Sequence, residues 1–160
     1  MGHLPLLRRV AWLAVPAIGY AVCLLLVVFW PVPVDRDAGA DLLRALGWLH
    51  RHGVPEWFDY ALVEWLANVV MFVPFGFLLA AALRPLHWWI ALLAAAAAST
   101  GIEWAQRRLL PERYASVADI AANTLGALAG IALCGVLLLA AAARSKSRSR
   151  RRASPTAARP

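Results

Sequence analysis

Four long apolar runs constrain this chain more than any other feature of its sequence. They cover residues 10–30, 61–83, 86–104 and 117–143, and charged residues, prolines or tryptophans bound them. A hydrocarbon core about 30 Å thick is crossed by roughly 20 apolar residues in a helix. With 62% hydrophobic and only 16% charged residues, the composition is also far from that of a soluble domain. The sequence therefore predicts an all-α membrane protein, a compact bundle of four transmembrane helices.

The distribution of positive charge predicts the orientation of this bundle. If successive runs alternate in direction, ten of the 16 Lys and Arg residues lie on the side of the termini and six on the other side. Cytoplasmic segments are enriched in Lys and Arg. We therefore expect residues 1–9 and the C-terminus in the cytoplasm.

The C-terminal segment, residues 144–160, holds seven of these cations among Ser, Pro and Ala without apolar periodicity. Such a composition predicts a disordered basic tail. A cationic segment beside a span attracts anionic lipid, whereas nucleic-acid binding would need aromatic platforms or a folded basic domain. We expect contact with membrane lipids and none with nucleic acid.

The first outer loop contains one further helical pattern. Leu42, Leu46 and Leu49 follow a spacing of i, i+4 and i+7, which predicts a short interfacial helix lying on the membrane surface. His50 and His52 lie in the same loop without a Cys or a third His nearby, so surface residues are expected there and not metal ligands. We expect neither a metal ion nor a cofactor.

Polar residues in the last three runs also recur at helical spacing, so each helix should carry one polar stripe. The stripes consist of Glu64 and Asn68, of Ser99, Glu103 and Gln106, and of Asp119 and Asn123. In the predicted topology all three stripes lie in the outer leaflet. A carboxylate at the bilayer centre costs on the order of 2.5–3.5 kcal/mol, so we expect these side chains to face a shared polar pocket.

Basic residues surround the predicted pocket. Arg107, Arg108 and Arg113 lie in the short outer loop after the third run, and guanidinium groups there could pair with the carboxylates or contact phosphate. The alternative is that the ionisable residues only cap helices or pair; Asp119 could be the N-cap of the last helix. Independent caps, however, would not need matching depth and matching faces on three helices.

Several motifs in residues 61–133 coincide with these stripes. They are Asn-x-x-x-Phe-x-Pro-x-Gly from Asn68, Ile-Glu-x-x-Gln from Ile102, Pro-x-Arg from Pro111, and Asp-Ile-x-x-Asn-x-x-Gly from Asp119. In combination they resemble the VanZ-like family of small bacterial membrane proteins. The resemblance implies an integral membrane protein of the cell envelope and a link to lowered susceptibility to glycopeptides such as teicoplanin. It implies no particular reaction.

Three kinds of function fit these residues. The first is a polar pocket that binds, shields or modifies an envelope component, such as a lipid headgroup or a lipid-linked wall precursor; the residues are compatible with both a catalytic and a non-catalytic version. The second is a transporter module that relays protons or ions through its carboxylates and, with four spans, would need oligomers. The third is an adaptor for other membrane proteins.

Overall fold

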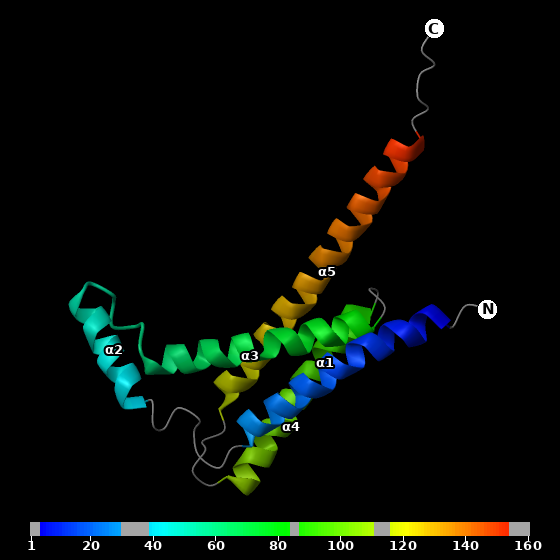
Figure 1. The fold of residues 1–160 in the computed structure, drawn as a ribbon. Coiled ribbons are helices and arrows are strands. Elements are labelled where there is room, and N and C mark those ends of the chain that lie inside the picture. Colours follow the sequence, from blue (N-terminus) through cyan, green and yellow to red (C-terminus); the bar gives the residue numbers. More distant parts are fainter. Residues whose placement is uncertain (1–3, 30–38, 84–86, 111–115, 154–160) are drawn as a thin grey trace.

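The computed structural model of the protein describes residues 4–29, 39–83, 87–110 and 116–153. Five helices follow one another in this order: α1 (Leu4–Val28), α2 (Gly39–Arg51), α3 (Tyr60–Ala82), α4 (Trp88–Leu109) and α5 (Val117–Ala153). α1, α3, α4 and the first half of α5 form a bundle, and α2 lies apart from it near the start of α3 (Figure 1). The all-α fold is as predicted from the apolar runs.

Two of the described helical segments are long and apolar enough to cross a membrane, Tyr60–Ala82 and Val117–Ser149. Ala14–Val28 is a shorter apolar stretch of α1. α1 begins six residues earlier than residue 10, because Pro5 is tolerated in a first helical turn and the arginines that follow it are good helix formers.

The crossing of α3 and α5 depends on three glycines. A Cβ atom on Gly76 would lie under 3.0 Å from backbone atoms of Ala127, and one on Gly126 or Gly130 would meet the carbonyl oxygens of Val69 or Val73 as closely. Only hydrogen atoms in place of side chains allow the two backbones to approach this far. Gly126 and Gly130 are four residues apart and therefore lie on one face of α5, and α3 is the helix that this face contacts.

α1 and α4 pack around this crossing. The buried side chains of α4 include Ala91, Ala95, Ser99 and Glu103, one on each successive turn. On the side of α1, Leu24 and Val28 form a small apolar core with Phe72 of α3, which is completely buried. The Tyr20 hydroxyl of α1 also donates a hydrogen bond to the carbonyl oxygen of Met71.

α2 forms where the short amphipathic helix was predicted, but its apolar stripe faces the protein. Leu46 is buried, Leu42 and Leu49 are half-buried, and α2 contacts α3. The His50 ring shares a hydrogen bond of 3.0 Å with the carbonyl oxygen of Phe58, which holds the α2–α3 connection against the helix. The stripe therefore packs against the chain itself.

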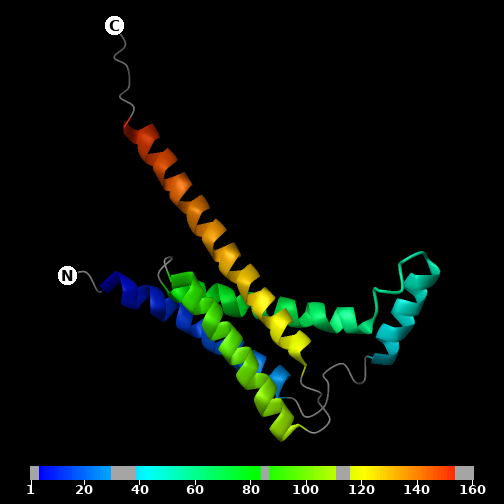
Figure 2. The ribbon, with the colours of Figure 1, turned by 180° about the vertical axis from the view of Figure 1, so that it is seen from behind.

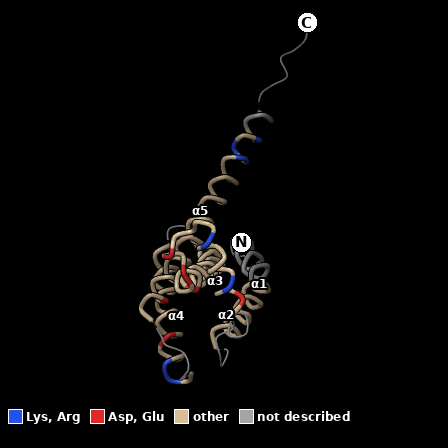
Figure 3. The backbone as a smooth tube through the Cα atoms, turned by 90° about the vertical axis from the view of Figure 1, so that its left-hand side faces the viewer, with Lys and Arg blue, Asp and Glu red and all other residues tan. Residues whose placement is uncertain are grey.

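α5 departs from the expectation of a disordered tail beginning at residue 144. The helix continues to Ala153 without a break, and its second half extends beyond the bundle in opposite views (Figures 1 and 2). The segment from Ala140 is rich in Ala and Arg, which favour helix, and lacks Pro and Gly before Pro155. Figure 3 shows the basic residues on this extension, away from the acidic residues of the bundle.

Candidate functional site

α1 and α4 end, and α5 begins, at the same end of the bundle (Figure 1). Polar side chains near this end contact one another and the helix termini. Among the described residues, Ser99, Glu103, Gln106 and Asn123 are the buried polar side chains, with 0%, 5%, 7% and 4% of their surface exposed. All four belong to the predicted stripes. We define the polar cluster as these four residues together with Asn68 and Asp119.

Two side-chain hydrogen bonds join the stripes of different helices. Asn68 Nδ2 on α3 donates to Asp119 Oδ1 on α5 at 3.0 Å, and Asn123 Nδ2 on α5 donates to Ser99 Oγ on α4 at 2.9 Å. Asp119 and Asn123 are four residues apart and therefore lie on one face of α5. The structure thus brings the stripes of α3, α4 and α5 together at adjacent levels.

Glu103 connects the end of α4 with the start of α5. Its Oε2 accepts a hydrogen bond of 3.1 Å from the backbone N–H of Ser116, while Ser116 Oγ accepts from the N–H of Ala118 at 3.0 Å. Ser116 therefore caps the helix, and Asp119 lies in its first turn instead of at the N-cap. Both carboxylates lie where the helix dipole favours negative charge.

Ser116 was not among the residues predicted for the site. The available signal is Ser116 followed three residues later by an acidic residue just before an apolar run, a pattern typical of a helix N-terminus. That pattern identifies the cap. It gives no indication that a carboxylate from the preceding helix binds the N–H group of the same serine.

Gln106 extends the cluster to α1. Its Nε2 donates to the carbonyl oxygen of Val28, the last residue of that helix, at 2.8 Å. Carbonyl groups in the last turn have no partner within their own helix, and Gln106 supplies a donor for one of them. Gln106 was predicted for the site, but its partner lies in a helix outside the matching motifs.

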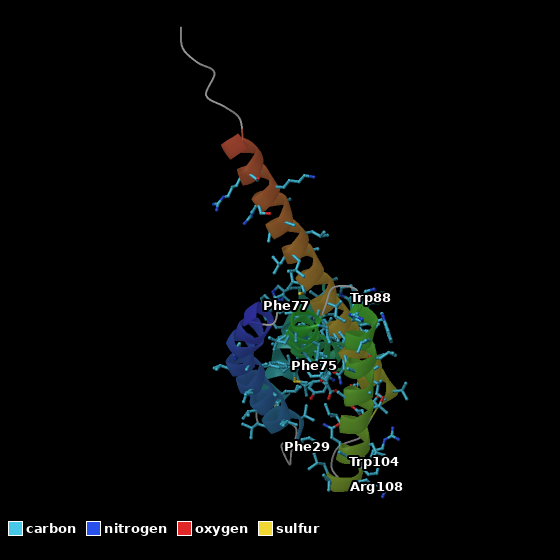
Figure 4. All side chains as sticks on the ribbon, turned by 90° about the vertical axis from the view of Figure 1, so that its right-hand side faces the viewer. Phe29, Phe75, Phe77, Trp88, Trp104 and Arg108 are labelled. Carbon is cyan, nitrogen blue, oxygen red and sulfur yellow. The ribbon has the colours of Figure 1, made fainter. Side chains whose placement is uncertain are left out.

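The remaining predicted residues lie around the cluster. Glu64 is exposed, one turn before Asn68, and is not among the buried polar residues. Arg107 and Arg108 are exposed on the last turn of α4, and the Arg108 guanidinium lies 5.1 Å from the centre of the Trp104 ring (Figure 4). Arg113 lies outside the described residues. The two described arginines thus form a basic rim beyond Glu103.

The chemistry of the cluster is mainly that of hydrogen-bond acceptors. Each amide NH₂ group of Asn68, Gln106 and Asn123 donates within the protein. Among the described residues no group of three or more His, Cys, Asp or Glu side chains could hold a metal ion. The arrangement combines two carboxylates, amide oxygens and a basic rim, which suits a ligand that carries both a donor and an anionic group.

A family model of VanZ/LLP1 matches residues 17–139, which include every residue of the polar cluster and the basic rim. The match also includes the second half of α1 and all of α2, beyond the region of the sequence motifs. The chain has no significant match among curated proteins or among solved structures.

Proposed function

This chain belongs to the VanZ/LLP1 family of membrane proteins, and from that premise we propose that its polar cluster binds a phosphate-bearing component of the cell envelope at the outer membrane face. The component is a lipid headgroup or a lipid-linked wall precursor. Arg107 and Arg108 contact its phosphate, and Glu103 and Asp119 position its remaining polar groups. Through this binding the protein lowers susceptibility to a glycopeptide such as teicoplanin.

The burial of Glu103 is the observation that carries the proposal. Only 5% of this carboxylic acid is exposed, in a bundle whose other contacts are formed largely by Ala, Gly, Leu and Phe. Polar residues at membrane depth are costly and are typical of binding or transport sites. Interhelical hydrogen bonds in membrane proteins stabilise the fold on average by only about 0.6 kcal/mol each. Stabilisation of the helix packing is therefore a weak explanation for a buried acidic residue at this position.

The proposal includes four spans, formed by α1, α3, α4 and α5, with both termini in the cytoplasm. Trp88 at the start of α4 and Trp104 near its end lie at opposite ends of the bundle (Figure 4), as tryptophans at two membrane interfaces would. The basic extension of α5 lies on the side of Trp88. That side is therefore assigned to the cytoplasm, and the polar cluster to the outer leaflet.

Cysteine accessibility tests this topology. In a background with Cys23 and Cys134 replaced by Ala, Trp57→Cys should react with a membrane-impermeant maleimide in intact cells. Ser147→Cys should react only after the cells are opened. The reverse pattern, or labelling of both from the same side, would contradict the proposed orientation.

The function is tested in cells that express the protein or lack it. Teicoplanin susceptibility and envelope-lipid composition are compared for the wild type, Glu103→Gln, Asp119→Asn and the double variant Arg107→Gln/Arg108→Gln. Thr100→Val is the matched control, because Thr100 is exposed and its hydroxyl donates within α4 to the carbonyl oxygen of Ala96.

We expect lower teicoplanin susceptibility with the wild type and with Thr100→Val, and loss of this effect in the carboxylate and arginine variants. A lipid composition that changes with the carboxylates would identify a catalytic version of the function, and an unchanged composition a shielding version. Full protection by both Glu103→Gln and Asp119→Asn would refute the site. Ion flux into liposomes carrying the purified protein would instead favour a transporter.

A further inference from the structure

The amide group of Asn123 has a buried oxygen that the internal hydrogen bonds leave unsatisfied. Its Nδ2 donates to Ser99 Oγ, whereas Oδ1 is inaccessible and has no hydrogen-bond partner within the part of the chain that the structure describes. A buried acceptor without a partner costs about 1–3 kcal/mol. Asn123 thus marks a position for a hydrogen-bond donor that the described residues do not supply.

The other donor groups of the polar cluster are engaged in hydrogen bonds elsewhere. The amide groups of Asn68 and Gln106 and the backbone N–H of Ser116 already donate to Asp119, to Val28 and to Glu103. A carboxylate has about four lone-pair sites, so Glu103 and Asp119 can each accept hydrogen bonds from more than one donor. Two carboxylates near an amide oxygen favour a donor that is positively charged.

The spacing of the cluster residues along α4 and α5 indicates how far the donor would lie from the basic rim. Ser99, Glu103 and Arg107 are spaced by four residues on α4, and Asp119 and Asn123 by four on α5. A helical turn rises about 5.4 Å. Since Asn123 contacts Ser99, its amide oxygen lies about one turn deeper in the bundle than the carboxylates, and the arginine lies one turn further out.

We propose that the polar cluster recognises a phosphoester with a primary ammonium group on a short linker, as in an ethanolamine phosphate headgroup. The phosphate lies at Arg107 and Arg108, and the ammonium lies on the inner side of the Glu103 and Asp119 carboxylates, where it donates to Asn123 Oδ1. This inference rests on the proposed binding of a phosphate-bearing envelope component and specifies its chemical class. A lipid and a soluble phosphoester share this chemistry, and the experiment separates them.

The experiment compares two lipids that differ only in the methylation of the headgroup amine. Phosphatidylethanolamine and phosphatidylcholine with identical short acyl chains carry the same phosphate and the same net charge, but a quaternary choline has no N–H group. Each is titrated into the full-length protein in maltoside micelles, and the affinity is derived from the shift in unfolding midpoint. Soluble phosphoethanolamine is titrated in parallel.

We expect phosphatidylethanolamine to bind about tenfold more tightly than phosphatidylcholine, because a hydrogen bond between a charged donor and a buried acceptor is worth roughly that much. The double variant Ser99→Ala/Asn123→Leu removes both partners of one hydrogen bond and the unsatisfied oxygen together. It should fold as well as the wild type without lipid and should bind both lipids equally. Thr124→Val serves as the control, since the Thr124 hydroxyl donates within α5 to Ile120.

Each result separates the inference from the proposed function. Equal binding of the two lipids, with both weakened by Arg107→Gln/Arg108→Gln, would overturn the ammonium site and leave phosphate binding supported. Binding of neither lipid and no binding of phosphoethanolamine would overturn both. An ethanolamine preference that persists in Ser99→Ala/Asn123→Leu would refute the role of Asn123. Equally tight binding of soluble phosphoethanolamine would support the ammonium site and refute a lipid as its source.

Discussion

Replacement of Gly76 by alanine should destabilise the protein through one added methyl group. The new Cβ would lie under 3.0 Å from the Cα, carbonyl carbon and oxygen of Ala127. Carbon atoms pack optimally at about 3.5–4.0 Å, so α3 and α5 would have to separate by about 1 Å. Backbone atoms cannot rotate away as a flexible side chain can, and the separation weakens contacts along the whole crossing.

From this geometry we expect the free energy of unfolding to fall by about 2–3 kcal/mol, the upper part of the range for overpacked sites. The assay is unfolding by sodium dodecyl sulfate in mixed micelles, followed by tryptophan fluorescence and circular dichroism. Gly135→Ala on α5 is the control, because a Cβ there has no atom within 4 Å. It should be neutral, or stabilising by about 0.5–1 kcal/mol through its lower backbone entropy.

Two results would refute this account of the crossing. One is a Gly76→Ala protein that unfolds at the same detergent fraction as the wild type. The other is a Gly135→Ala protein that loses as much stability as Gly76→Ala. We also expect Gly76→Ala and Gly126→Ala to be less than additive, because both side chains force apart the same pair of helices.

Three other substitutions test the packing and the polar cluster by the same unfolding titration. Phe72→Ala should cost about 3–5 kcal/mol, since this side chain is completely buried; a loss below about 1 kcal/mol would contradict its place in the core. Asn68→Ala and Asp119→Ala should show a coupling of roughly 1 kcal/mol in a double-mutant cycle, and purely additive losses would argue against their hydrogen bond. Glu103→Gln should cost less than Glu103→Ala, by about 1 kcal/mol, because its carbonyl oxygen can still accept from Ser116 N–H; equal losses would show that this contact is unimportant.

The sequence was sufficient to predict the helices and which polar residues share a helix face. Apolar runs bounded by charge and proline predicted α1, α3, α4 and most of α5, because helix formation depends on local spacing and on residue type. The recurrence of Ser99, Glu103 and Gln106, and of Asp119 and Asn123, predicted which residues share a helix face. These patterns are local, so the amino-acid sequence of each helix contains them completely.

The partners of those residues depended on the tertiary structure. Gln106 donates to Val28 and Glu103 accepts from Ser116, whereas Glu64, on the predicted stripe of α3, is exposed. The difference arises because the packing of the helices against one another determines which turn of each polar stripe is covered. Sequence periodicity gives the face of a helix, but only the packing of whole helices fixes which of its residues meet.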